Sequence, residues 1–267
     1  MTLGRAVRSV VGGGDRSGAV KRLFNEHAIP ADATVMVHGS FRHLAHKGWR
    51  AEEFVEALHE CLSDGTLLMP AMSWRAVNPD NPLFDEMMTP SITGVLSEVF
   101  RQCYATHRSL HPTHSVAGRG PMAAAILGTH HIDETPCSDL SPVGRLSAVE
   151  GYVMLLGVEM DSCTLIHHAE EKIAPERYLR GEVETYTCRR RDGMEIAVRT
   201  RRHWRLPRNF WQFEDMLAER GLVRRSTIDG VSCRSFPAQD MDHLVIDALR
   251  RAPDGTIARP GQRFKMM

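Results

Sequence analysis

Three short, largely apolar runs constrain the fold of this chain most strongly. They cover residues 34–38, 66–69 and 153–158. Runs of this length predict strands that are buried on both faces, which is typical of parallel sheets. Segments with helical spacing of apolar residues alternate with these runs along the chain. Such an alternation predicts an α/β fold, in which a largely parallel central sheet is covered by helices on both faces. The segments with helical spacing of apolar residues are 19–28, 51–62, 91–104 and 164–173.

The pattern changes after about residue 180, where strand pairs joined by tight turns replace the long alternation. We expect residues 180–267 to form an α+β extension on the sheet, within a single domain of residues 1–267. Residues 1–17 are expected to be a loose lead-in, because three consecutive glycines at 12–14 pack nothing. The elements expected in the extension are two hairpins around Asp-Gly turns, at 186–201 and 223–236, and two helices, at 210–221 and 239–251.

The composition excludes several classes of function. Lys plus Arg and Asp plus Glu both number 33, so no global basic field predicts a nucleic-acid or anionic-membrane partner. No apolar run is long enough to span a bilayer, and the N-terminal stretch lacks the apolar core of a signal peptide. The six cysteines form no C-x-x-C pair. We therefore expect a reduced, cytoplasmic protein whose cysteines are mostly core or surface thiols.

Ligands of such sheets bind at the carboxyl ends of the strands, so the loops after His38, Met69 and Val158 are the first candidates for a site. The first of these loops has a glycine and a hydroxyl, Gly39 and Ser40, directly after the strand. Small residues of this kind let backbone N–H groups approach a phosphate, and Arg42 can pair with it.

The stretch 164–171, Thr-Leu-Ile-His-His-Ala-Glu-Glu, could carry chemistry. Residues three apart share a helix face, so His167 is expected beside Glu170 and His168 beside Glu171. An imidazole held by a carboxylate can abstract a proton. Only one pair can face the strand ends, and we expect the other to be solvated. A surface helix with two stabilising pairs remains the alternative.

Other reactive groups give weaker indications. Residues 111–116 favour a proline-bounded turn that enters a strand. The order H-H-A-E-E is not a metal motif, and His107, His111 and His114 could converge on a metal only through folding, so none is expected. Cys163 lies four residues before His167 and could form a covalent acyl-enzyme, although direct transfer is preferred.

Taken together, these stretches resemble the aminoglycoside 3-N-acetyltransferase family, also called the antibiotic N-acetyltransferases. They occur in the family's order over residues 19–175, whereas the C-terminal third matches only loosely. The stretches that carry the resemblance are VMVHGSFR (35–42), GTLLMP (65–70), RSLHPTHSV (108–116), PCSDLSPVG (136–144), LLGV (155–158) and TLIHHAEE (164–171).

The resemblance implies an αβα layered sandwich that transfers an acetyl group from acetyl-CoA to an aminoglycoside, at the 3-amino group of its deoxystreptamine ring. His167 would be the general base and Glu170 its acidic partner. One departure is Gly39, where the family usually has a hydroxyl residue. The residues implied near CoA are His38, Gly39, Ser40, Phe41, Arg42, Leu44, Ser73, Ser115 and Val116. Backbone N–H groups, or the hydroxyl of Ser40 or Ser115, could stabilise the oxyanion.

A polycationic acceptor needs carboxylates in its pocket. The candidates are Asp80, Asp85, Glu86, Asp161, Glu182 and Glu214. Three alternatives stay open: acyl transfer to another amine, a metal-dependent hydrolase, and a non-catalytic protein that binds CoA or another small molecule. A homodimer is also left open.

Overall fold

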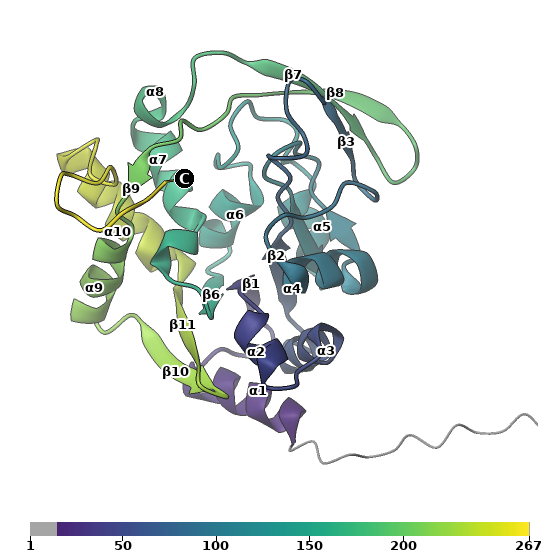
Figure 1. Cartoon of the computed structure of the whole chain (residues 1–267), viewed down its shortest axis with the longest axis vertical. Coiled ribbons are helices and arrows are strands. Elements are labelled where there is room, and N and C mark those ends of the chain that lie inside the picture. The colour runs from purple at the N-terminus through teal and green to yellow at the C-terminus, as the bar shows by residue number, and fades with distance from the viewer. Residues whose placement is uncertain (1–14, 267) are drawn as a thin grey trace, which may run out of the picture.

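A computed structural model of the chain describes residues 15–266 (Figure 1). Most of the expected lead-in, including its three glycines, therefore lies outside the described residues. Asp15 caps the first helix, because its side chain accepts a hydrogen bond from the backbone N–H of Gly18 at 2.8 Å. That helix begins at Arg16, so the last residues assigned to the lead-in are helical.

The order of elements follows the predicted alternation. The helices are α1 (Arg16–Glu26), α2 (Arg42–His46), α3 (Ala51–Cys61), α4 (Val95–Val99), which continues as a π-helical turn η1 (Phe100–Tyr104), α5 (Ala123–Leu127), α6 (Pro142–Ala148), a 3-10 turn η2 (Met160–Ser162), α7 (Leu165–Ile173), α8 (Pro175–Tyr178), α9 (Trp211–Glu219) and α10 (Ala238–Arg251). The strands are β1 (Thr34–Gly39), β2 (Thr66–Pro70), β3 (Leu83–Asp85), β4 (His107–Arg108), β5 (Val116–Arg119), β6 (Tyr152–Leu156), β7 (Glu184–Arg189), β8 (Glu195–Thr200), β9 (Pro207–Arg208), β10 (Arg224–Ile228), β11 (Val231–Pro237) and β12 (Lys265–Met266).

The central sheet has seven strands in the order β10-β11-β6-β1-β2-β5-β4. The three apolar runs form its centre, and β1 pairs in parallel with both β2 and β6. The other strands of this sheet pair antiparallel: β11 pairs with β6 and β10, and β5 pairs with β2 and β4. Within this sheet, parallel pairing is thus confined to the three strands that the apolar runs predict.

Alternate residues of the central strands point into two separate cores. Met36 belongs to the core that includes side chains of α5, α6, α7, α9 and α10, whereas its neighbours Val35 and Val37 belong to the core that includes side chains of α1 and α3. Both faces of the sheet are therefore covered by helices, as Figure 1 shows. The αβα layered sandwich is confirmed.

Three features differ from the sequence prediction. The helix α2 interrupts the loop expected at 39–49, and the helix expected from residue 91 begins only at Val95, after Gly94 with its positive φ of 116°. The second hairpin of the C-terminal extension is an edge of the central sheet itself, because β11 pairs with β6. The first hairpin forms a small separate sheet with β3.

Within residues 15–266, no helix has the length and apolar character that crossing a membrane requires.

Candidate active site

A cavity of about 650 Å³ lies at the carboxyl ends of the three central parallel strands. Its lining includes His38 and Gly39 at the end of β1, Pro70 at the end of β2, and Val158 just after β6. These are the three loops at which the sequence predicts a ligand site. His167 also lines the cavity, from the first turn of α7.

His167 and Glu170 form the predicted pair. The imidazole Nδ1 lies 2.7 Å from Glu170 Oε2, and the two side chains are 9% and 0% exposed. A carboxylate can only accept, so Nδ1–H donates to it and Nε2 is left as the basic nitrogen. A histidine held in this tautomer can take a proton from a group bound in the cavity.

Glu170 is held as a carboxylate by cationic and polar neighbours. Arg208, from β9, lies with its Nε 2.9 Å from Oε1, and its side chain is 1% exposed. The hydroxyl of Thr256 donates to the same oxygen. Burial raises the pKa of Glu170, but His167, Arg208 and Thr256 together outweigh burial and hold that pKa below its usual value.

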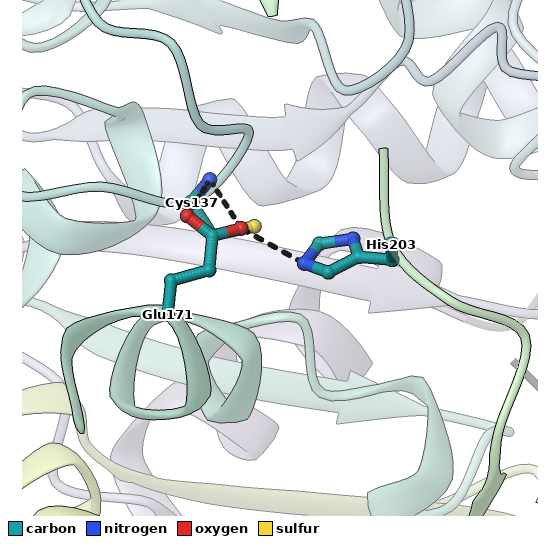
Figure 2. A group of neighbouring side chains, drawn as sticks. All are labelled: Cys137, Glu171 and His203. Atoms are coloured by element: carbon teal, nitrogen blue, oxygen red, sulfur yellow. Dashed lines mark hydrogen bonds and ion pairs between the residues drawn. The ribbon is translucent and has the colours of Figure 1, made fainter. Parts of the chain in front are cut away.

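A second histidine, His203, stacks on His167 with ring centroids 4.6 Å apart. It also lines the cavity, and its Nε2 lies 2.8 Å from Glu171 Oε1 (Figure 2). Glu171 in turn accepts hydrogen bonds from the backbone N–H of Cys137 at 2.8 and 2.9 Å. Burial raises the pKa of Glu171 to about 7, and burial together with the nearby His167 lowers that of His203 well below its usual value.

Cys137, Glu171 and His203 are the one group of described residues whose donor atoms converge closely enough to hold a metal ion. Their ligand atoms lie within 4.8 Å of one another. The carboxylate already accepts two hydrogen bonds from the Cys137 backbone and pairs with His203. Hydrogen bonding therefore accounts for the convergence of these three residues.

His38 lines the cavity with a buried ring. Its side chain is buried, and its Nε2 has no hydrogen-bond partner among the described residues. Burial lowers the pKa of His38 to about 4, so the ring is neutral near pH 7. A buried nitrogen without a partner is costly unless a ligand supplies one.

The expectation that the second His–Glu pair is solvated is wrong. His168 and Glu171 are 2% and 6% exposed, and they do not pair with each other. His168 Nδ1 lies 2.7 Å from Asp242 and its Nε2 lies 2.9 Å from Asp139. The reason is that α10 packs against α7 and supplies Asp242, so both faces of α7 are covered.

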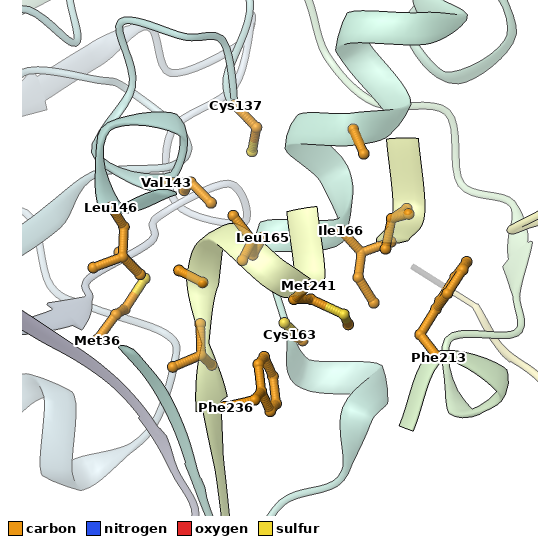
Figure 3. Close-up of a cluster of buried hydrophobic side chains, with 14 of the residues drawn as sticks. Met36, Cys137, Val143, Leu146, Cys163, Leu165, Ile166, Phe213, Phe236 and Met241 are labelled. Atoms are coloured by element: carbon orange, nitrogen blue, oxygen red, sulfur yellow. The ribbon is translucent and has the colours of Figure 1, made fainter. Parts of the chain in front are cut away.

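Cys163 does not line the cavity. Its side chain is fully buried in the hydrophobic core beneath α7, with Met241 and Phe236 as other members of that core (Figure 3). Burial raises the pKa of the thiol to about 12. A thiol in such surroundings is a poor nucleophile, which removes the basis for a covalent acyl-enzyme at this residue.

Of the residues predicted near CoA, His38 and Gly39 line the cavity and the others do not. Phe41, Leu44 and Val116 are core side chains, and Arg42 is exposed on α2. The other hydroxyl residues named for this role, Ser40, Ser73 and Ser115, are also absent from the lining.

The buried serines have structural roles instead. The Ser73 hydroxyl donates to the carbonyl of Pro112, and the Ser115 hydroxyl donates to the carbonyl of Ala71, each at 2.6 Å. The backbone N–H of Ser40 donates to the carbonyl of Leu156 at 2.9 Å. The oxyanion role expected for Ser115 is therefore wrong, because its proton is already donated.

Of the six acidic candidates, only Asp161 lines the cavity, and it lies 2.8 Å from Lys265 Nζ. The other five lie elsewhere: Asp80 and Glu182 are exposed, Asp85 and Glu86 pair with Arg189 and Arg191, and Glu214 pairs with Arg225 and Arg234. These five residues lie outside this cavity, so it does not bring them together with His167.

Sequence reasoning missed the cavity residues that follow residue 180. Arg208 lies 38 residues beyond Glu170, and His203 comes from the segment between β8 and β9. Neither residue belongs to a recognisable motif, and long-range pairing of this kind leaves no local pattern.

Comparisons with known proteins agree with the fold. A family model described as aminoglycoside 3-N-acetyltransferase matches residues 36–250. Aminoglycoside N(3)-acetyltransferase III of Pseudomonas aeruginosa is 28% identical over 249 residues, covering 85% of this chain and 90% of that protein. The aminoglycoside N(3')-acetyltransferase-like protein YokD of Bacillus subtilis is 27% identical, covering 76% of this chain and 80% of that protein.

A solved structure of an aminoglycoside acetyltransferase has a similar fold. The aminoglycoside acetyltransferase AAC(3)-IVa, as a histidine-to-alanine mutant in complex with a gentamicin, superimposes with a TM-score of 0.76 at 26% identity. The match covers 94% of this chain and 95% of that chain. The family match spans most of the chain, and the chain therefore belongs to the aminoglycoside 3-N-acetyltransferase family, a family of acetyltransferase enzymes.

Proposed function

We propose that this protein transfers an acetyl group from acetyl-CoA to an amino group of a small molecule, with His167 as the general base. The observation that carries the proposal is the His167–Glu170 pair, which lines a cavity at the carboxyl ends of the parallel strands. The relatives suggest an aminoglycoside as the acceptor, acetylated at the 3-amino group of the deoxystreptamine ring.

The chemistry follows from the arrangement of the pair. Acetyl-CoA, when bound, supplies a thioester carbonyl. As the amine nitrogen bonds to that carbonyl carbon, His167 Nε2 takes the proton of the amine, and Glu170 offsets the charge of the imidazolium. When the C–S bond breaks, the imidazolium can return the proton to the departing sulfur. The products are an amide and free CoA, and His167 is neutral again.

Two features suit acetyl-CoA as the donor. His38 offers a buried nitrogen that has no partner among the described residues. Gly39 adds no side chain beside it, and a Cβ there would crowd Leu96 Cδ2 at 3.1 Å. A cytoplasmic location, where acetyl-CoA is made and used, is part of the proposal.

A second candidate acceptor is an amine other than an aminoglycoside. The specific observation in its favour is that the described lining of the cavity offers one carboxylate, Asp161, which is already paired with Lys265. A metal-dependent hydrolase is a weaker candidate, and it would rest on Cys137, Glu171 and His203. Metal analysis before and after chelation, with activity measured on both samples, separates this candidate from acetyl transfer.

The test is release of free thiol from acetyl-CoA, followed with a panel of aminoglycosides and structurally unrelated amines. We expect release that depends on an amine, and an acetylated amine detected by mass spectrometry in equal amount. Tight binding of acetyl-CoA with no release for any amine would instead indicate a non-catalytic binding protein.

A further inference from the structure

The lining of the cavity is unusually basic for a site that would bind a polycation. Among the described residues it holds six side chains that are cationic near neutral pH and one carboxylate, Asp161. The cationic residues are Arg75, Arg180, Arg202, Arg205, Arg208 and Lys265.

Two of these cations are neutralised within the chain. Arg208 pairs with Glu170 at 2.9 Å, and Lys265 pairs with Asp161 at 2.8 Å. The remaining four arginines, at positions 75, 180, 202 and 205, make no ion pair with a carboxylate of residues 15–266. The single carboxylate of the described lining is therefore already used, and the cavity keeps an excess of positive charge.

The excess of positive charge comes from the arginines and not from three histidines that line the cavity. His38, His114 and His203 have pKa values below the usual one, chiefly because of burial, so they are neutral near pH 7. The Nε of Arg180 is buried without a hydrogen-bond partner among the described residues. An ammonium-rich acceptor would be repelled here, whereas an anion would gain ion pairs and hydrogen bonds.

Two of the arginines, Arg75 and Arg202, lie beside a row of rings that leads to the catalytic pair. Trp74 stacks on His114, His114 contacts His203, and His203 stacks on His167, with centroid distances of 5.9, 5.2 and 4.6 Å. Arg75 is the neighbour of Trp74 in sequence, and the Arg202 guanidinium donates to the Trp74 carbonyl at 2.9 Å.

This row joins Trp74, which lies beside Arg75 and Arg202, to His167 through three ring contacts. The phosphates of CoA lie beyond its long pantetheine arm, far from the thioester. Arg202 and Arg205 lie one and two residues from His203 along the chain, and both line the cavity that His203 and His167 share.

We propose that the acceptor is an amine that also carries an anionic group, a phosphate or a carboxylate, and that Arg75, Arg202 and Arg205 bind this group. The proposal rests on the acetyl transfer proposed above and specifies its acceptor class. It departs from the polycationic antibiotics that the relatives' names imply.

The test measures binding by titration calorimetry to protein saturated with CoA, so that the donor's phosphate sites are filled and no turnover occurs. The probes share one amino sugar: glucosamine, glucosamine 6-phosphate, and muramic acid, which carries a carboxylate. Gentamicin is the polycationic comparison. We expect at least one anionic sugar to bind at least about tenfold more tightly than glucosamine, and gentamicin to bind more weakly than that sugar.

The double variant Arg75→Ala/Arg205→Ala should lose that advantage of about tenfold while its affinity for CoA is unchanged. Arg220→Ala, an exposed arginine at the end of α9, is the matched control and should behave as the wild type. Preference for phosphate or for carboxylate identifies the anionic group.

The proposal is overturned if gentamicin binds as tightly as the anionic sugars, or if no anionic sugar binds more tightly than glucosamine. It is also overturned if the double variant loses affinity for CoA instead, because the arginines would then hold the donor. These readouts need no turnover, so they stay interpretable even if thiol release fails for every amine.

Discussion

The Nδ1 of His167 lies 2.7 Å from Oε2 of Glu170, one helical turn further along α7. Glu170 is fully buried, and Arg208 and Thr256 contact its other oxygen. The carboxylate is thus fixed from both sides, and it fixes the imidazole in turn. This geometry places the Nε2 of His167, oriented as a base, at the wall of the cavity.

Replacing Glu170 by Gln tests the orientation of that base. An amide can donate to Nδ1 and so favour the opposite tautomer, which would leave Nε2 protonated and inactive. We expect kcat to fall by a factor of roughly 10² to 10⁴, with little change in KM for acetyl-CoA. Steady-state kinetics measures this, and Glu176→Gln, at an exposed position of α8, is the control. An unchanged kcat would show that Glu170 is not needed for catalysis.

Replacing Arg208 by Met tests the buried ion pair. The change leaves the Glu170 carboxylate buried without its cation, so we expect the free energy of unfolding to fall by about 3–5 kcal/mol. Denaturant unfolding measures the loss, and Arg220→Met is the matched surface control. The double variant Arg208→Met/Glu170→Met should recover much of the loss. A loss below about 1 kcal/mol for the single variant would contradict the pairing.

Glu171 predicts a specific pH dependence of stability. Its pKa is raised from 4.5 to about 7 by burial, so the folded state retains a proton that the unfolded state releases earlier. Stability should therefore fall as pH rises from about 4.5 to about 7, and this component should be absent from Glu171→Gln. Unfolding by urea across this range, for both proteins, gives the difference. A difference that does not vary with pH would refute the raised pKa.

Gly144 is predicted to be intolerant of a side chain. A Cβ at this position would lie 2.4 Å from the carbonyl oxygen of Ser138 and 3.0 Å from Cδ2 of His168. We expect Gly144→Ala to destabilise the protein by about 1–3 kcal/mol, measured as a shift in thermal unfolding. Gly181→Ala is the control, because nothing lies within 4 Å of its Cβ position. Equal effects of the two substitutions would contradict the close packing around α6.

The sequence predicts those parts of the fold that have a local signal. The largely apolar run 34–38 predicts a strand that is buried on both faces, which is β1. The three-residue spacing of His167 and Glu170 predicts that they share one face of a helix, which is α7. The strand β4 has no such signal, because it consists of only two residues. Its strand character comes from pairing with β5, which no local pattern encodes.

In the site too, features with a local sequence signal are predicted and features set by tertiary packing are not. The pair on α7 is predicted because both residues lie on one helix, whereas the contact of Arg208 with Glu170 depends on how β9 packs against α7. The acidic candidates are selected by charge alone, and charge does not reveal that Asp85 and Glu86 pair with arginines of the small sheet. Tertiary packing decides which charges face the cavity.

The most direct test of the mechanism is a single-turnover measurement of acetyl transfer by His167→Ala, with folding and acetyl-CoA affinity checked on the same sample. We predict a rate lower by a factor of roughly 10² to 10⁴, unchanged affinity for acetyl-CoA, and partial recovery when imidazole is added. A folded variant that binds acetyl-CoA and transfers the acetyl group at nearly the wild-type rate would contradict His167 as the general base.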